Sequence, residues 1–204
     1  MEARTLTQRR RAATEMDIAL ATAQLFSERG TSEVTVEEIA ALAGVSVRTF
    51  YRYFPTKEDA IGPLLAVGAS DWQDAIADAD EPDVIDAIRA AIAQVLRVDT
   101  ARPDQRELLG WTRDLIRRTA EDAALRGVWS RANADSEIRL AAIIAGRLGD
   151  DADPLTIRLL AAAGTDAIRV SLEHWAIDDG AAFTASAALA QSSFDRLSAG
   201  LRSE

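Results

Sequence analysis

Three helix-start signals that lie within about 25 residues constrain the fold of this chain more than any other feature. Thr35 is followed three positions later by Glu38, which is the capping-box pattern of a helix N-terminus. Gly44 follows the apolar positions of that helix and suits a left-handed C-terminal stop. Ser46 can cap the next helix, and Thr56 repeats the start signal. This order of helix, glycine turn and helix predicts a helix-turn-helix unit.

The stretch GVSVRTFYRYF, residues 44–54, could be a strand or a helix, because its apolar residues partly alternate. A strand needs a partner, and no other candidate strand lies nearby in the sequence. As a helix, the stretch places Val47, Phe50 and Phe54 on one face, which we expect to point into a small core. The opposite face collects guanidinium, hydroxyl and phenol groups, namely Arg48, Thr49, Tyr51, Arg52 and Tyr53. Such a face suits phosphates and base edges, and the alternative is an ordinary amphipathic helix with exposed tyrosines.

Charge is distributed unevenly along the chain. The 204 residues carry a formal net charge of −10, but residues 1–57 hold eight basic and seven acidic residues, whereas the remainder holds 15 basic and 26 acidic residues. The acidic excess therefore belongs to the C-terminal part and does not argue against DNA binding by the N-terminal part.

The composition also limits the possible chemistry. The chain has no cysteine, and His174 is its single histidine, which excludes thiolate metal sites and sites with several histidines. The acidic residues before Pro154 could suggest a metal site, but solvated carboxylates and helix caps are the ordinary explanation. We expect no enzymatic activity and no cofactor.

Helical signals continue along the whole chain and predict an all-α protein. We expect a flexible basic arm over residues 1–12 and a first helix over residues 14–29. The later helices are predicted over residues 57–78, 82–99, 103–119, 121–148, 154–178 and 181–201. The predicted domains are an N-terminal arm with a three-helix head, residues 1–57, and a helical body, residues 58–204. With no apolar signal sequence and no run near the ~18–20 residues of a membrane span, we expect a cytoplasmic protein without a membrane partner.

The segment TVEEIAALAGVSVRTFYRYFPTKEDAI resembles the DNA-binding segment of TetR-family transcriptional regulators. The resemblance covers roughly residues 12–62, and the aromatic residues after the glycine turn make it specific. Lys57, the only lysine of the chain, lies where the family motif has a lysine. The resemblance implies a DNA-binding head followed by a body that binds a ligand and forms dimers.

Family roles transfer to the matching positions as follows. Arg48 is expected to contact a base, because a guanidinium binds guanine in a bidentate manner, and Val47 to contact a thymine methyl group. Lys57 is expected to provide a charge for phosphate at the start of the fourth helix. The full set of expected DNA contacts is Arg9, Arg10, Arg11, Thr35, Ser46, Val47, Arg48, Thr49, Tyr51, Arg52, Tyr53 and Lys57. For Arg9, Arg10 and Arg11 of the arm, a disordered tail is the equal alternative.

In the body, the resemblance implies a homodimer formed by the last two helices and a small-molecule effector bound between helices. Candidate ligand contacts are Trp72, Trp111, Trp129, Asn133, Thr165 and Asp166, although core packing, capping or exposure would explain each of them as well. The C-terminal half, with phrases such as RLGDDADPLTIRLLAAA, also resembles regulators of the mycofactocin-regulator type. That resemblance implies an acyl-CoA or another amphiphilic effector.

The function predicted from these observations is sequence-specific DNA binding by a repressor that a ligand releases from a palindromic operator. An activator is one alternative. A second alternative is an interaction module that keeps the fold and does not bind DNA.

Overall fold

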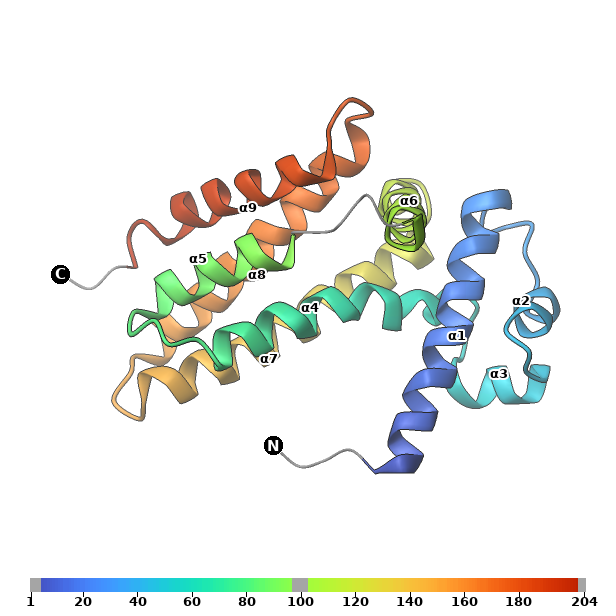
Figure 1. Ribbon diagram of the computed structural model, residues 1–204, viewed down its shortest axis with the longest axis horizontal. Coiled ribbons are helices and arrows are strands. Elements are labelled where there is room, and N and C mark those ends of the chain that lie inside the picture. Colours follow the sequence, from blue (N-terminus) through green and yellow to red (C-terminus); the bar gives the residue numbers. More distant parts are fainter. Residues whose placement is uncertain (1–4, 97–102, 202–204) are drawn as a thin grey trace.

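The computed structural model describes residues 5–96 and 103–201, and these residues form helices joined by short turns, without any strand. The elements are α1 (Leu6–Arg29), α2 (Val36–Leu42), α3 (Val47–Tyr53), the 3₁₀ helix η1 (Asp59–Ile61), α4 (Gly62–Ala77), α5 (Val84–Val95), α6 (Pro103–Arg118), α7 (Ala123–Leu148), α8 (Pro154–Ile177) and α9 (Phe183–Ser198). The molecule is elongated, with α1–α3 at one end and α4, α5, α7, α8 and α9 forming the larger part (Figure 1). The prediction of an all-α protein is confirmed.

The head, α1–α3, is held together by apolar side chains from all three helices. Phe26 of α1, Ile39 of α2 and Phe50 of α3 are fully buried in one cluster, and Phe54 is almost fully buried beside them. The predicted core roles of Phe50 and Phe54 are therefore confirmed. Because α2 and α3 have seven residues each, this shared cluster, rather than helix propensity, must stabilise them.

Two predicted helix starts were wrong. The first helix begins at Leu6 rather than near residue 14, because Thr5 and Gln8 form a capping box, so residues 6–12 are helical and not a flexible arm. Residues 1–4 of the predicted arm lie outside the described residues. The helix predicted from residue 57 begins as η1, and α4 starts only at Gly62, although Thr56 bonds Asp59 as expected.

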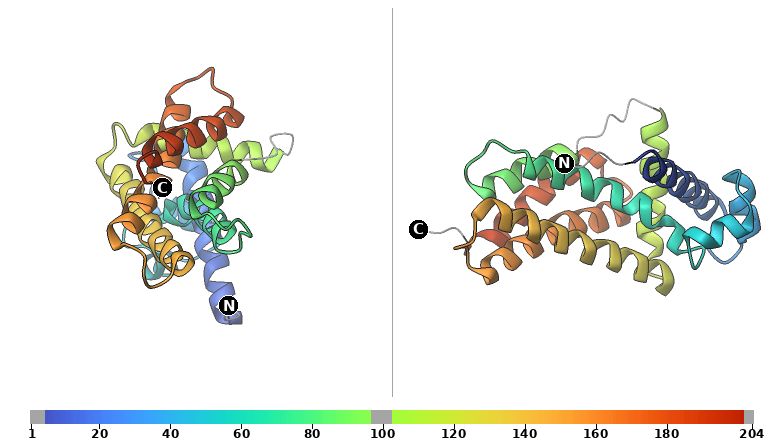
Figure 2. Two further views of the ribbon diagram at one scale, coloured as in Figure 1. Left: turned by 90° about the vertical axis from the view of Figure 1, so that its left-hand side faces the viewer. Right: turned by 90° about the horizontal axis from the view of Figure 1, so that it is seen from below.

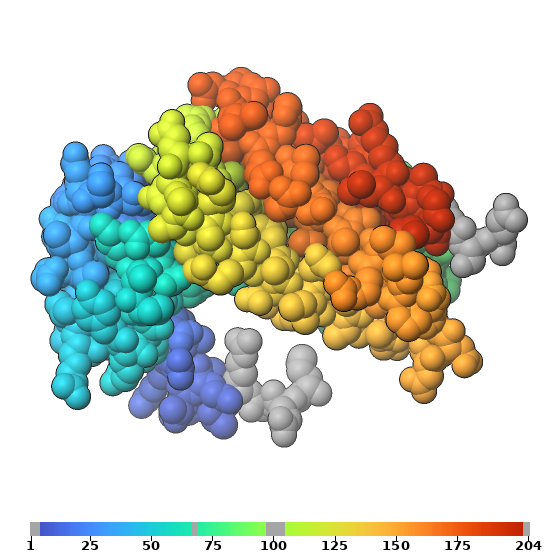
Figure 3. Space-filling model, turned by 180° about the vertical axis from the view of Figure 1, so that it is seen from behind, coloured from blue at the N-terminus to red at the C-terminus, as the bar shows by residue number. Residues whose placement is uncertain are grey.

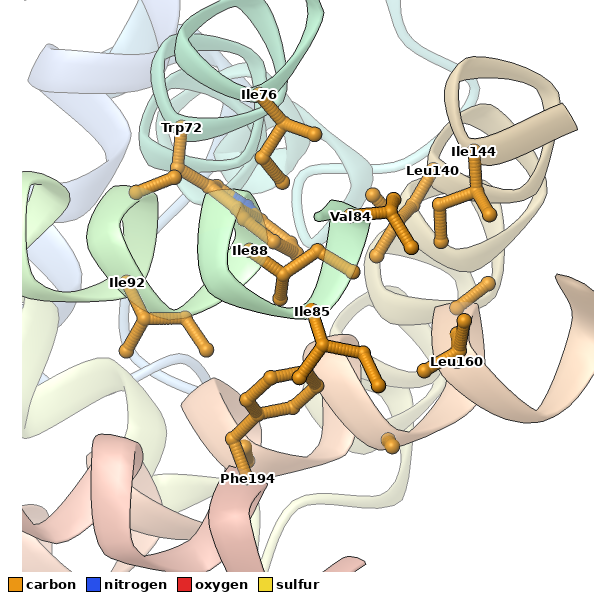
Figure 4. Packing of buried hydrophobic residues seen from close by; sticks show 14 of the residues in the cluster. Trp72, Ile76, Val84, Ile85, Ile88, Ile92, Leu140, Ile144, Leu160 and Phe194 are labelled. Atoms are coloured by element: carbon orange, nitrogen blue, oxygen red, sulfur yellow. The ribbon is translucent and has the colours of Figure 1, made fainter. Parts of the chain in front are cut away.

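The core of the body is built from α4, α5, α7, α8 and α9. Figure 4 shows Trp72 of α4, Ile88 of α5 and Leu140 of α7 in one buried cluster with side chains of α8. Gly164 of α8 permits this close approach, since a Cβ atom there would lie 3.1 Å from Leu140 Cδ2 and 3.4 Å from the ring of Trp72. A larger side chain at this position would push α8 away from α4 and α7.

Helix α6 runs across the other helices and connects the two parts of the molecule (Figure 2). On one side, the Asp114 carboxylate accepts a hydrogen bond of 2.5 Å from the Ser27 hydroxyl of α1. On the other side, Arg117 Nε donates to the Ala176 carbonyl of α8 at 3.0 Å. Leu115 of α6 is buried in the same cluster as the apolar residues of the head, so the head and the body share a core. The predicted domain boundary at residue 57 therefore stays a prediction.

None of the described helices is both long enough and apolar enough to cross a lipid bilayer.

Candidate nucleic-acid interface

The turn between α2 and α3 has the geometry that the sequence predicts. Thr35 caps α2, with Thr35 Oγ1 accepting from the Glu38 N–H at 3.3 Å and Glu38 Oε2 accepting from the Thr35 N–H at 2.9 Å. Gly44 has a φ of 68°, in the left-handed region that favours glycine. The predicted capping box and glycine stop are confirmed, and together they fix the path from α2 into α3.

Glu38 also joins α2 to the end of α1. The Arg29 guanidinium donates to both carboxylate oxygens of Glu38, at 2.8 and 3.0 Å. This hydrogen-bonded pair, helped by the Thr35 bonds, lowers the pKa of Glu38 from 4.5 to about 2. The pairing spans nine residues and two helices, and no local sequence pattern predicts it.

Helix α3 presents a cationic and phenolic face to solvent. Ser46 caps it, because Ser46 Oγ accepts from the Thr49 N–H at 3.1 Å and lies 2.9 Å from Thr49 Oγ1. Phe50 points inward, whereas Arg48, Tyr51 and Arg52 are exposed. Among the residues that the structure describes, the Arg48 guanidinium has no hydrogen-bond or ion-pair partner. The stretch is therefore a helix with a buried aromatic face, and its outer face is available for a ligand.

Tyr53 connects this face to α1. Two guanidinium groups lie near its ring, with the Arg11 carbon 5.6 Å and the Arg52 carbon 5.1 Å from the ring centroid. Cations at these distances are attracted by the ring quadrupole. Arg11 is also bonded to Glu15 at 2.9 Å. The contact between Arg11 and Tyr53 was not predicted from the sequence, because residues 1–12 were expected to form a flexible arm.

The first turns of α1 project beyond the rest of the molecule, beside α3 (Figures 1, 2 and 3). Every side chain from Thr5 to Ala13 is exposed, including those of Arg9 and Arg10. The Thr5–Gln8 capping box holds this segment as a helix. The signal was present in the sequence as a threonine three positions before a glutamine. Arg9, Arg10 and Arg11 of the predicted arm are thus carried on a helix next to the outer face of α3.

The Lys57 side chain is bonded to the loop between α1 and α2, and its expected phosphate contact stays a prediction. Its Nζ donates to the backbone carbonyls of Thr31 at 2.6 Å and Val34 at 2.9 Å. The side chain is 24% exposed, and Glu58 lies 4.0 Å from the ammonium. At least two of the ammonium donors therefore point into the α1–α2 loop.

The candidate ligand contacts are not brought together. Trp72 is buried in the body core and lines a groove of about 220 Å³ between α4 and α5, whereas Trp111 packs against the head cluster. Trp129 donates from its ring nitrogen to Glu173 at 2.8 Å, and Asn133 donates back to the Trp129 carbonyl. Of the two remaining candidates, Asp166 is exposed and paired with Arg169, and Thr165 is buried with no hydrogen-bond partner for its hydroxyl in the described chain. A shared ligand site for these residues stays a prediction.

Two family models match the chain. The model of bacterial regulatory proteins of the tetR family matches residues 18–60, which include all of α2 and α3. The model of the MftR C-terminal domain matches residues 82–202, which is more than half of the chain. The chain belongs to the TetR family. Both resemblances predicted from the sequence are therefore confirmed, and regulators of the TetR family are in general DNA-binding proteins rather than enzymes.

Solved structures of TetR-family regulators share this fold. NalD of Pseudomonas aeruginosa, the secondary repressor of the MexAB-OprM multidrug efflux pump, has a TM-score of 0.57 at 19% identity, covering 93% of this chain and 95% of that chain. FadR of Bacillus subtilis, solved in complex with stearoyl-CoA, has a TM-score of 0.56 at 20% identity, covering 91% and 98%. GusR of Salmonella enterica has a TM-score of 0.54 at 19% identity, covering 93% and 95%. No curated protein matches the sequence.

Proposed function

We propose that this TetR-family protein is a homodimeric repressor that binds a near-palindromic operator through α3 and is released by a small-molecule effector. The observation that carries the proposal is the outer face of α3, where Arg48, Tyr51 and Arg52 are exposed while Phe50 anchors the helix from inside. A capped helix of this kind can enter a major groove with its first residues at the base edges.

The head residues divide into base contacts and phosphate contacts. Arg48 and Val47, in the first turn of α3, are the proposed base contacts, because guanidinium groups read guanine and apolar groups meet thymine methyls. The proposed phosphate contacts, which set the register of the head on the duplex, are Arg9, Arg10, Arg11, Thr35, Thr49, Tyr51, Arg52 and Tyr53. Ser46 holds α3 in place as its cap.

The dimer is proposed to form through α8 and α9. Four large apolar side chains of α8 remain exposed, Leu155 at 64%, Leu159 at 43%, Val170 at 44% and Ile177 at 68%. Their spacings of 4, 11 and 7 residues place them on one stripe of the helix. Exposed apolar residues gathered on one helix face are typical of a protein–protein interface, and here the stripe is interrupted by Asp166, which is paired with Arg169. Two recognition helices held by such a dimer could meet successive major grooves, roughly 34–36 Å apart.

The proposed effector is an amphiphilic molecule such as an acyl-CoA. Support comes from the C-terminal family match and from FadR of Bacillus subtilis, which was solved with stearoyl-CoA. The groove beside Trp72 is lined by Ala75, Ala91 and Val95 and also by Asp71 and Gln94, so it offers both apolar and polar contacts to an amphiphilic ligand. An effector acts only if it binds the DNA-free conformation more tightly than the DNA-bound one.

Selection from a random-sequence duplex library with the purified full-length chain tests the DNA-binding part. The proposal expects enrichment of sites with two related half-sites, one helical turn apart or a multiple of it. A selected duplex then serves as a probe for release by stearoyl-CoA. If no sequence is enriched, the interaction module becomes the better account. Enrichment followed by increased transcription from a template with the site would instead support an activator.

A further inference from the structure

The ammonium group of Lys57 is bonded to the backbone of the loop between α1 and α2. An ammonium has three N–H donors, and two of those of Lys57 are used by the carbonyls of Thr31 and Val34. Val34 is only 1% exposed, so its carbonyl would be left buried without a hydrogen-bond donor if Lys57 moved away, which costs free energy. An outward rotation of Lys57 towards a phosphate would break both bonds.

The same loop is bonded to the body. The Thr31 hydroxyl donates to Asp122 Oδ2 at 2.6 Å, while Asp122 Oδ1 accepts from the Ala124 and Leu125 N–H groups and so caps α7. Burial raises the pKa of Asp122, but these hydrogen bonds and the nearby charge of Lys57 outweigh burial and leave the pKa below its ordinary value. A single connected set of bonds therefore runs from Lys57 through Thr31 to the start of α7.

We infer that Lys57 is a positioning residue, which holds the α1–α2 loop and, through Thr31, ties the DNA-binding head to the start of α7, rather than a phosphate contact. The loop leads directly to Thr35, the cap of α2, so its position decides how α2 and α3 are presented. Arg29 supports the same loop, because it donates to the Glu33 carbonyl at 2.8 Å. Only the expected effect of Lys57 on operator binding rests on the DNA-binding function proposed above; its role in holding the loop does not.

The first test needs no DNA. Hydrogen exchange of the free protein is compared for the wild type, Lys57→Met, Lys57→Arg and Thr31→Val. We expect exchange of the amides in residues 31–36 to rise about tenfold in Lys57→Met, because two charge-assisted bonds are lost, and to be largely restored in Lys57→Arg. Thr31→Val should give a smaller increase. Unchanged exchange in Lys57→Met would overturn the inference, whether or not the protein binds DNA.

The second test uses the selected operator duplex at several salt concentrations, with the active fraction of each variant fixed by stoichiometric titration. A positioning role predicts that Lys57→Met weakens binding about tenfold while the slope of log K against log salt stays that of the wild type. A phosphate contact predicts a slope smaller in magnitude by about 0.9, and a role in stability alone predicts unchanged affinity of the folded fraction. Either of these two results would overturn the inference.

The exposed Arg10 provides the matched control. Arg10→Met should reduce the magnitude of the salt slope by about 0.9 if its guanidinium meets a phosphate, and it should leave the exchange of residues 31–36 unchanged. If the wild type binds no duplex selectively, the proposed function fails, and the exchange measurement still decides the role of Lys57.

Discussion

The outer faces of α3 and α8 are both exposed in the single chain, but they differ in chemistry. The α3 face carries Arg48 and Arg52, charged groups that water solvates well. The α8 face carries a stripe of four exposed apolar side chains, which water solvates poorly. The comparison agrees with the two different partners proposed above, a polyanion for α3 and a second copy of the chain for α8. It also predicts that salt weakens binding at the first face and has little effect at the second.

The two helices are also held in place differently. Helix α3 has seven residues and depends on the Ser46 cap and the buried Phe50. Helix α8 has 24 residues, begins at the Asp153 cap, and has its last turn bonded by α6, where Arg113 donates to the Trp175 carbonyl at 3.1 Å. Because α6 also bonds α1, a displacement of α8 can be transmitted to the head.

The largest expected effect comes from placing charge on the α8 face. The double substitution Leu159→Glu/Val170→Glu should convert the dimer to monomers, because an unpaired carboxylate in an apolar interface costs about 3 kcal/mol or more. Operator affinity should fall at least about 100-fold as a consequence. Light scattering coupled to size-exclusion chromatography measures the mass. Ile138→Glu, at an exposed apolar position of α7, is the control and should remain dimeric. If the double variant of α8 stays dimeric, the proposed dimer interface is wrong.

The next effect concerns base reading by α3. Arg48→Ala should lower the ratio of operator to scrambled-duplex affinity by about 10- to 100-fold, because a bidentate guanine contact discriminates by ~1–3 kcal/mol. Binding to the scrambled duplex should change much less. The measurement is fluorescence anisotropy with both duplexes under the same conditions. An equal loss on the two duplexes would assign Arg48 to the phosphate contacts.

A smaller effect is expected from the start of α1. Arg10→Met should weaken operator and scrambled duplex by the same factor, about three- to tenfold at low salt, because phosphate contacts carry no sequence information. The loss is expected because Arg10 is exposed on the first turns of α1, beside α3 (Figure 1). An unchanged affinity would place the projecting turns of α1 away from DNA. Ile138→Glu again serves as a variant far from the α3 face.

The smallest effect is on the acid stability of the head. Because the folded-state pKa of Glu38 is depressed to about 2, its stabilising contribution is complete above pH 4.5 and is lost as the pH falls from 4.5 towards 2. Glu38→Gln should therefore melt slightly below the wild type at neutral pH, by roughly 2 °C or less, and the difference should disappear near pH 2. Melting followed by circular dichroism measures it. A difference that grows on acidification would contradict the assignment.

Local signals in the sequence predicted the head well. Thr35, Gly44 and Ser46 each act on backbone groups within a few residues, so their roles could be read from spacing alone. The Thr5–Gln8 capping box was equally local, and it was missed because the run of arginines after it suggested a flexible arm. The boundaries of α6, α7, α8 and α9 were correct to within three residues for the same reason, whereas the predicted end of the helix at residue 99 lies outside the described residues.

Contacts between distant residues could not be predicted in this way. The bonds of Thr31 to Asp122 and of Lys57 to Thr31 span 91 and 26 residues, and they depend on how the α1–α2 loop meets the α6–α7 turn. The family motif gives the position of Lys57 and not the direction of its side chain. The tryptophans show the same limit, because a large apolar residue in a helix can enter any of the separate clusters.

The most direct measurement of the central claim is the affinity of the wild-type dimer for its selected operator and for a scrambled duplex, at about 50 mM and about 200 mM salt. The account predicts tight binding that falls by about 10³-fold or more over this range, with the operator preferred at both concentrations by at least about 10³-fold. Equal binding to the two duplexes, or an affinity that does not respond to salt, would contradict DNA recognition by the α3 face.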